Sequence, residues 1–195
     1  MNIKKWIYLF FTTLFIGGLS SVVVGLLLRW QDINDASSFF VMIAWLMGFG
    51  FIFSIISQMG YFAYLTIHRF GLGIFKSVKL WSWVQLLVLA FVVFDLFYLR
   101  YIAFKDSGLP FWNYLFVPLA LLAIGALVAY IKMKETNKAA FVPTLFFMVA
   151  VTTIEWIPVL KQGEPLWLWL SIVPLLACNA WQILILHRLI DKKKS

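Results

Sequence analysis

Two carboxylates lie inside otherwise apolar stretches of the sequence, and they are the residues best placed to do chemistry. Asp95 is the only charged residue in 80–99, and Glu155 is the only one in 139–160. Thr152 precedes Glu155 by about one helical turn and extends its polar face. Because a charged side chain is costly in hydrocarbon, each carboxylate needs either a partner or a function.

The two carboxylates allow two interpretations. If both helices run outward, Asp95 and Glu155 lie at similar depth, near the outer ends of their helices. Each side chain then either pairs with Arg100 or Lys161, or hydrogen-bonds another helix, and so stabilises the structure. Otherwise the two carboxylates line an outward-opening cavity that receives a ligand or a proton. The second interpretation predicts a small-molecule or ion transporter, or a ligand receptor, that uses Asp95 and Glu155.

Other signatures of catalysis or metal binding are missing from the sequence. It contains no H-E-x-x-H metal motif, no G-x-S-x-G nucleophile elbow and no glycine-rich phosphate loop. His68 and His187 each precede an arginine at the end of an apolar run, and a metal site built from them would lack further obvious histidine or cysteine ligands. We therefore expect a protein that is not an enzyme and that needs no metal or other cofactor.

The composition is that of an integral membrane protein. Of the 195 residues, 64% are hydrophobic and 12% are charged, whereas soluble domains are about 25% charged. A helix needs about 20 apolar residues to cross the hydrocarbon core, where its backbone must satisfy its own hydrogen bonds. The connections are too short for a soluble domain, so we predict an all-α fold with one transmembrane domain, 1–195. The six predicted spans of this polytopic bundle are 6–28, 39–67, 80–99, 111–131, 139–160 and 166–186.

The lysines and arginines predict the orientation of the chain. With both termini in the cytosol, 12 of them lie on the inner side and 4 on the outer side, which is the bias of the positive-inside rule. The basic excess then faces the anionic lipids of the inner leaflet rather than nucleic acid. We therefore expect a multi-pass protein of the plasma membrane with cytosolic N- and C-termini.

The stretch 65–79 interrupts the apolar pattern, and we expect it at the cytosolic surface. Its two glycines are suited to end a helix, because glycine adopts positive φ at little cost. Basic and apolar side chains mix here, as in segments that lie among lipid headgroups or against a partner helix. An interfacial turn and a partner-docking surface both fit this pattern. The candidate docking residues are His68, Arg69, Phe70, Gly71, Gly73 and Phe75.

Small and polar side chains predict how the helices pack, because lipid gives no hydrophobic reward for helix contact. A ladder of small residues, each four apart, lets another backbone approach the first span, either within the bundle or in a dimer. A polar set nearer the cytosol is suited to interhelical hydrogen bonds or to a small-molecule pocket. The ladder consists of Thr13, Gly17, Ser21 and Gly25, and the polar set consists of Thr12, Thr13, Ser57, Gln58, Gln85, Asn179 and Gln182.

Four stretches of the sequence carry a resemblance to a known family. They are FSIISQMGYFAYLTIHRFGLGIF (53–75), WSWVQLLVLAFVVFDLFYLRYI (81–102), FVPTLFFMVAVTTIEWIPVL (141–160) and PLLACNAWQILIL (174–186). The inner part of the first, ISQMGYFAYLTIHRFGLG, is long and unusual, which makes it specific. Together they resemble the KinB-signalling pathway activation protein family (KbaA) of spore-forming bacteria.

The resemblance implies a membrane protein that promotes signalling through the sensor histidine kinase KinB, and so the phosphorelay that starts sporulation. It implies no catalytic or ligand-binding residue. Because the chain has almost no soluble mass, we expect helix or cytosolic-loop contact with KinB or an associated pathway protein. The small-residue face of the first span, or the stretch 68–79, would make this contact. The transporter or receptor that uses Asp95 and Glu155 is the alternative.

Overall fold

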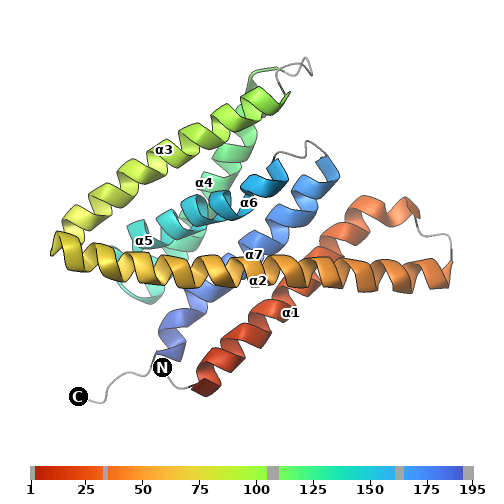
Figure 1. The fold of residues 1–195 in the computed structure, drawn as a ribbon, viewed down its shortest axis with the longest axis horizontal. Helices are drawn as coiled ribbons and strands as arrows, with labels where there is room; N and C mark the ends of the chain where they lie inside the picture. Colours follow the sequence, from red (N-terminus) through yellow and green to blue (C-terminus); the bar gives the residue numbers. More distant parts are fainter. Residues whose placement is uncertain (1–2, 33–34, 105–109, 161–164, 191–195) are drawn as a thin grey trace. The chain divides into compact units, whose positions relative to one another are not determined.

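Six helices in the described part of the chain are long and apolar enough to cross a membrane. The computed structural model describes residues 3–32, 35–104, 110–160 and 165–190. Figure 1 shows the helices in chain order. The predicted all-helical fold with six helices of membrane-spanning length is confirmed, whereas the bundle's insertion in a membrane and the cytosolic position of both ends stay predictions. The long helices are α1 (Ile3–Arg29), α2 (Ala36–Phe75), α3 (Val78–Phe104), α4 (Trp112–Glu135) and α7 (Pro165–Leu189).

The fifth span is built from consecutive helical pieces rather than one uniform helix. A 3-10 turn, η3 (Lys138–Ala140), leads into α5 (Phe141–Phe146), then a π-helical turn, η4 (Phe147–Val151), and finally α6 (Thr152–Leu160). A π turn is closed by i→i+5 hydrogen bonds instead of i→i+4 bonds, and such turns are frequent at functional sites. Glu155 lies in the first turn of α6, directly after this wider turn.

Helix α2 extends beyond the predicted span 39–67 at both ends. It begins after Asp35, whose carboxylate accepts hydrogen bonds from the backbone N–H and the hydroxyl group of Ser38 and so caps the helix. These hydrogen bonds hold the pKa of Asp35 below its ordinary value, so the cap is ionised at neutral pH. The helix continues to Phe75, and the chain reverses at Lys76, which has a φ of 50°.

The expectation that Gly71 and Gly73 end this helix is wrong, because both lie inside α2. Lys76 takes the positive φ instead. Gly71 lies against the indole ring of Trp81, at a place where a Cβ atom would overlap the ring. A glycine is therefore needed at this position because a side chain would not fit beside the ring, and not because the backbone has to adopt positive φ. The stretch 65–79 is mostly the last turns of a helix.

The described helices divide into two compact units. The second unit is Gly60–Gly163, and the first consists of Met1–Met59 and Glu164–Ser195. The first unit thus holds α1, the beginning of α2, and α7, whereas the second holds the end of α2, α3, α4 and the fifth span. Compact packing units are not by themselves separate folding domains, so the single-domain organisation stays a prediction.

In the first unit, α1 packs along α7, and the predicted small-residue ladder lies inside this packing. Thr13, Gly17, Ser21 and Gly25 are all buried. A Cβ atom at Gly17 would lie 2.8 Å from the carbonyl oxygen of Gly50 and 2.7 Å from Cβ of Ser54. The absence of a side chain lets the backbones of α1 and α2 approach closely. The ladder is therefore occupied by contacts within this unit.

Hydrogen bonds join the same helices through the polar set. Ser57 donates from Oγ to Oδ1 of Asn179 at 2.7 Å, and Gln182 donates from Nε2 to Oγ of Ser57 at 2.7 Å. Trp181 donates from Nε1 to Oγ1 of Thr12 at 3.1 Å. Each such bond inside a membrane protein is worth about 0.6–2 kcal/mol. In the structure, Ser57, Asn179, Gln182 and Thr12 therefore all take part in hydrogen bonds between helices.

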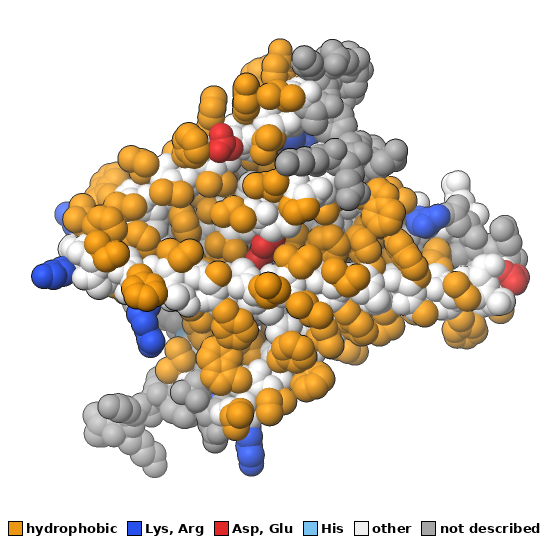
Figure 2. Space-filling view, in the orientation of Figure 1, with side chains coloured by type: hydrophobic (Ala, Val, Ile, Leu, Met, Phe, Trp, Pro, Cys, Tyr) orange, Lys and Arg blue, Asp and Glu red, His pale blue; other side chains and the backbone are white. Residues whose placement is uncertain are grey.

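Hydrophobic side chains cover most of the face of the molecule that Figure 2 shows. Many of the largest are well exposed, such as Phe40, Phe91 and Leu119. A surface of this kind is costly in water and suits contact with lipid chains. Together with the six long apolar helices, it identifies a membrane protein.

The close contact at Gly17 leads to a stability prediction. We expect Gly17→Val to destabilise the protein by about 1–3 kcal/mol, because the added side chain overpacks against Gly50 and Ser54. The matched control is Gly48→Val, since nothing lies within 4 Å of a Cβ atom at Gly48. Thermal unfolding in detergent micelles checks both variants. Equal melting temperatures for the two variants would contradict this packing.

Candidate functional site

A helical hairpin joins the end of α2 to the start of α3, and a hydrogen bond closes it. Trp81 donates from Nε1 to Nδ1 of His68 at 3.0 Å. The ring of Phe75 stacks on the ring of Trp81, with centroids 5.5 Å apart and planes 21° apart. The hydroxyl oxygen of Ser77 accepts a hydrogen bond from the backbone N–H of Leu80 at 3.3 Å and caps α3. The hairpin is thus held by packing and by capping.

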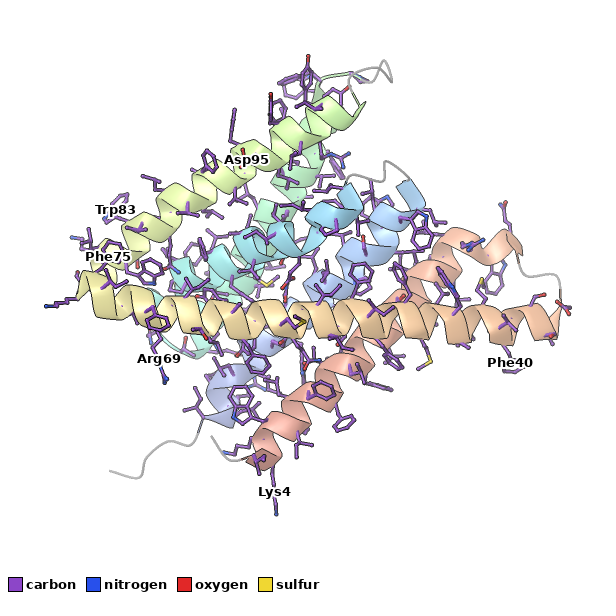
Figure 3. All side chains as sticks on the ribbon, viewed as in Figure 1. Lys4, Phe40, Arg69, Phe75, Trp83 and Asp95 are labelled. Carbon is purple, nitrogen blue, oxygen red and sulfur yellow. The ribbon has the colours of Figure 1, made fainter. Side chains whose placement is uncertain are left out.

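The hairpin divides the six candidate docking residues into two groups. His68, Gly71 and Phe75 turn toward Trp81 and hold the hairpin together. The other three, Arg69, Phe70 and Gly73, are exposed. Figure 3 shows Arg69 pointing away from α3, while Phe75 lies at the turn between the helices. Sequence reasoning had treated all six as one surface.

The exposed group has a further member that the sequence did not single out. Ile74 is 73% exposed, and its neighbour Phe70, one turn earlier on α2, is 67% exposed. We call Arg69, Phe70, Gly73 and Ile74 the outer hairpin face. It combines one guanidinium group with two large apolar side chains on a capped helical hairpin. Such a face can bind a partner by packing and by charge at the same time.

The second unit also encloses a polar interior at the π turn. Glu155 lies on α6 with its Oε1 atom buried against Gly60 of α2. A Cβ atom at Gly60 would overlap Oε1, and it would lie 2.9 Å from Cδ of the same carboxylate and 3.1 Å from Cγ1 of Val151. Thr152, the third sequence candidate here, is buried one turn earlier on α6. Gly60 therefore makes the space that the carboxylate occupies.

Two tyrosines of α2 line the same interior. Tyr64 donates from its hydroxyl group to the carbonyl oxygen of Pro143 at 2.8 Å, just before the π turn. The rings of Tyr61 and Tyr64 both pack on Phe147, with centroid distances of 5.5 and 5.0 Å. Phe147 is the first residue of the π turn and is fully buried. The irregular segment of the fifth span is thus packed against α2.

Two further polar side chains, Gln85 of α3 and Tyr61, are fully buried in this interior, and Gln85 lies beside Tyr64. Within the described residues, no hydrogen bond of normal geometry reaches either amide atom of Gln85 or the hydroxyl group of Tyr61. Buried polar groups are nearly always hydrogen-bonded. A carboxylate, a phenol and an amide in apolar surroundings form a set that could receive a proton or a small hydrogen-bonding guest.

The two sequence-predicted carboxylates differ in their surroundings, and a joint site of Asp95 and Glu155 stays a prediction. Asp95 is half-buried on α3, and within the described residues it forms neither an ion pair nor a hydrogen bond. It therefore does not pair with Arg100, and Lys161 lies outside the described residues. No group of three or more histidine, cysteine, aspartate or glutamate residues suited to a metal occurs in the described part of the chain.

Sequence reasoning missed Gly60, Tyr61 and Tyr64. No motif signals them, although the three-residue spacing of the tyrosines places both on one face of a helix. The π turn has no sequence signature either, so the residues that pack on it could not be chosen in advance. Gly60 and the tyrosines nonetheless define the surroundings of Glu155 and Phe147.

The hairpin hydrogen bond can be tested by a conservative change. We expect Trp81→Phe to destabilise the protein by about 0.5–1.5 kcal/mol, because His68 loses its donor while most of the ring packing remains. Trp83→Phe is the matched control, since Trp83 is 64% exposed. Thermal unfolding in micelles gives the comparison. A Trp81→Phe variant as stable as the control would argue against the hydrogen bond.

The space at Gly60 gives a second test. We expect Gly60→Ala to move the Glu155 carboxylate while costing less than about 1 kcal/mol, because the obstructed group is the end of a flexible side chain. Labelling of Glu155 by a hydrophobic carbodiimide, quantified by peptide mass spectrometry, should change in this variant. It should stay unchanged in Gly73→Ala, where nothing lies within 4 Å of a Cβ atom. Identical labelling of both variants would contradict the contact.

Comparison with known proteins covers nearly the whole chain. Residues 17–189 match the family model KbaA, described as KinB-signalling pathway activation in sporulation. The chain is also 41% identical to the KinB-signaling pathway activation protein of Bacillus subtilis (strain 168), over 98% of this chain and 100% of that relative. No solved structure matches the chain. The family that the four sequence stretches indicated is confirmed: the chain belongs to the KinB-signalling pathway activation family.

Proposed function

We propose that this chain is a non-enzymatic, multi-pass protein of the plasma membrane that activates KinB-dependent signalling. Support comes from a relative whose name is KinB-signaling pathway activation protein, and from a family described by the same pathway in sporulation. Six apolar helices account for most of the chain. A protein of this kind acts through its membrane helices and short connections, and we propose that it contacts the membrane kinase KinB or an associated protein.

The observation that carries this proposal is the outer hairpin face. Phe70 and Ile74 are large, apolar and well exposed, next to the exposed Arg69. Aromatic and arginine side chains are the residues that most often dominate binding energy in interfaces. The positive-inside pattern supports a cytosolic position for this face, from which it would reach a signalling partner. By contrast, the buried ladder on α1 offers little surface to a partner.

Activation requires that the contact distinguish two states of the partner. A ligand or protein can shift an equilibrium only by the difference in its affinity for the two states. A hairpin held by the Trp81–His68 hydrogen bond presents Arg69 and Ile74 in one arrangement. Such a surface fits one conformation of a partner better than another. This gives an activator without catalytic residues a physical way to work.

The proposal predicts that the outer hairpin face matters for signalling. In Bacillus subtilis lacking its own relative and complemented with this chain, we expect the double variant Arg69→Ala, Ile74→Ala to lower KinB-dependent sporulation by about tenfold. The matched control is Ile52→Ala, which removes another exposed aliphatic side chain from the same helix, 57% exposed against 73% for Ile74. Spore counts at equal membrane protein levels provide the measurement.

Direct contact is tested by photocrosslinking in the same cells. Photoreactive residues at Phe70 and Ile74 should crosslink to tagged KinB or to an associated pathway protein, whereas one at the buried Gly17 should not. Full sporulation in the double variant, together with no crosslink from either exposed position, would refute the docking proposal. The pathway role would then require another surface.

A second candidate function rests on the polar interior of the second unit. Glu155, Tyr61 and Gln85 place a carboxylate, a phenol and an amide in a buried region, as a ligand receptor or a small transporter would need. This second candidate function does not involve Asp95. Glu155→Gln separates the two functions: a receptor or transporter loses its activity at normal membrane levels, while crosslinking from Phe70 continues. The docking function keeps both its signalling output and its crosslinks.

A further inference from the structure

Asp95 lies half-buried beside a row of exposed apolar side chains on α3. Hydrophobic side chains at positions i−7, i−4, i+3 and i+7 share its face of the helix. All are exposed: Val88 by 38%, Phe91 by 62%, Tyr98 by 50% and Ile102 by 48%. Figure 3 places Asp95 on the side of α3, and Figure 2, in the same orientation, shows a carboxylate there among hydrophobic side chains. We call these five residues the α3 stripe.

Asp95 lies on the apolar part of α3, five residues before Arg100. The segment of α3 that is long and apolar enough to cross a membrane runs from Val78 to Ile102, and Asp95 is seven residues from its nearer end, or about 10 Å along the helix. A carboxylate within a membrane-spanning helix is costly and is normally paired. Within the described residues Asp95 has no ion pair and no hydrogen bond. Its partner has to come from outside this chain's described part.

We propose that the α3 stripe binds a transmembrane helix of another protein that carries a lysine or arginine at the depth of Asp95. The cation would pair with the carboxylate, and the apolar side chains around Asp95 would pack against that helix. We choose a basic helix because only a positive charge can pair with the carboxylate. A lipid chain supplies no counter-charge, and an acidic or neutral helix leaves Asp95 unpaired. The small Asp95 side chain leaves room for a long basic side chain to reach it.

A second copy of this chain is a poor occupant. Arg100 of α3 and Lys132 of α4 each already take part in an interaction within the chain. Lys132 is also buried. A symmetric pair of α3 helices would bring two Asp95 carboxylates together without a cation between them. The helix that binds the stripe therefore belongs to a different protein.

Photocrosslinking in native membranes tests the proposal. Photoreactive residues at Phe91 and Tyr98 flank Asp95, whereas control positions Trp83 and Ala90 are exposed but lie about 120° and 140° around the helix. We expect crosslinks from the first pair, identified by peptide mass spectrometry, to an apolar segment long enough to span the membrane and containing a lysine or arginine. The control positions should give much weaker crosslinks to that segment.

Charge variants decide whether Asp95 is responsible. Asp95→Asn should lower the crosslinking yield by about 3- to 30-fold, the range expected from interhelical polar interactions in membranes, and Asp95→Glu should keep most of it. Replacing the identified cation by Asp should restore the yield in Asp95→Lys. The thermal stability of the isolated Asp95→Asn protein should match the wild type, because no described group pairs with Asp95.

Each other outcome overturns the proposal. Crosslinks only to lipid, only to a second copy of this chain, or to a basic helix with equal yield in Asp95→Asn would refute it. A lower stability of the isolated Asp95→Asn protein would assign the carboxylate a structural role within the chain. The crosslinking test of the α3 stripe and the signalling test of the outer hairpin face can fail separately. The Arg69→Ala, Ile74→Ala variant changes the outer hairpin face and leaves the α3 stripe intact.

Discussion

Close approach of a helix backbone to its neighbour is the contact on which both packing units depend, since lipid gives no hydrophobic reward for helix association. Gly17 lies against the carbonyl of Gly50, and Gly71 lies against the indole ring of Trp81. Each glycine costs a helix about 1 kcal/mol relative to alanine. The stabilisation from the close contacts that each glycine permits must exceed this cost, because the helices continue through both positions. Helix α2 continues through Gly71 to Phe75, although that glycine in isolation weakens the helix.

The two carboxylates show how the same residue type takes different roles in one membrane protein. Glu155 is placed by the absence of a side chain at Gly60 and lies beside a π turn. Asp95 lies on an outer side of α3 among exposed aromatic residues, and within the described residues it has no ion-pair partner. An interior carboxylate is suited to a proton or a guest, whereas a carboxylate at the surface of a helix is suited to another helix.

Sequence reasoning predicted the features that depend on composition and failed on those that depend on packing. Long apolar runs identified six helices, because backbone hydrogen bonding leaves no other structure in hydrocarbon. The polar pairing of Ser57 with Asn179 was also accessible, since amides in membranes seek partners. The reversal at Lys76 was not, because positive φ is unusual for lysine and two glycines stood nearby. The end of α3 was not accessible either, since the helix continues past Leu99 and the charged Arg100 to Phe104.

The outer hairpin face and the α3 stripe both belong to the second unit and share one hairpin, which makes a joint role physically reasonable. From Val78, at the hairpin, to Asp95 is 17 residues, or about 25 Å along a continuous helix. A partner that met both surfaces would have to cross most of the bilayer, as a transmembrane kinase does. Because α3 is a single helix without internal proline, a tilt imposed at one surface would move the other. A partner bound at both places would therefore respond to the position of α3 as a whole, which gives the protein a way to favour one state of its partner.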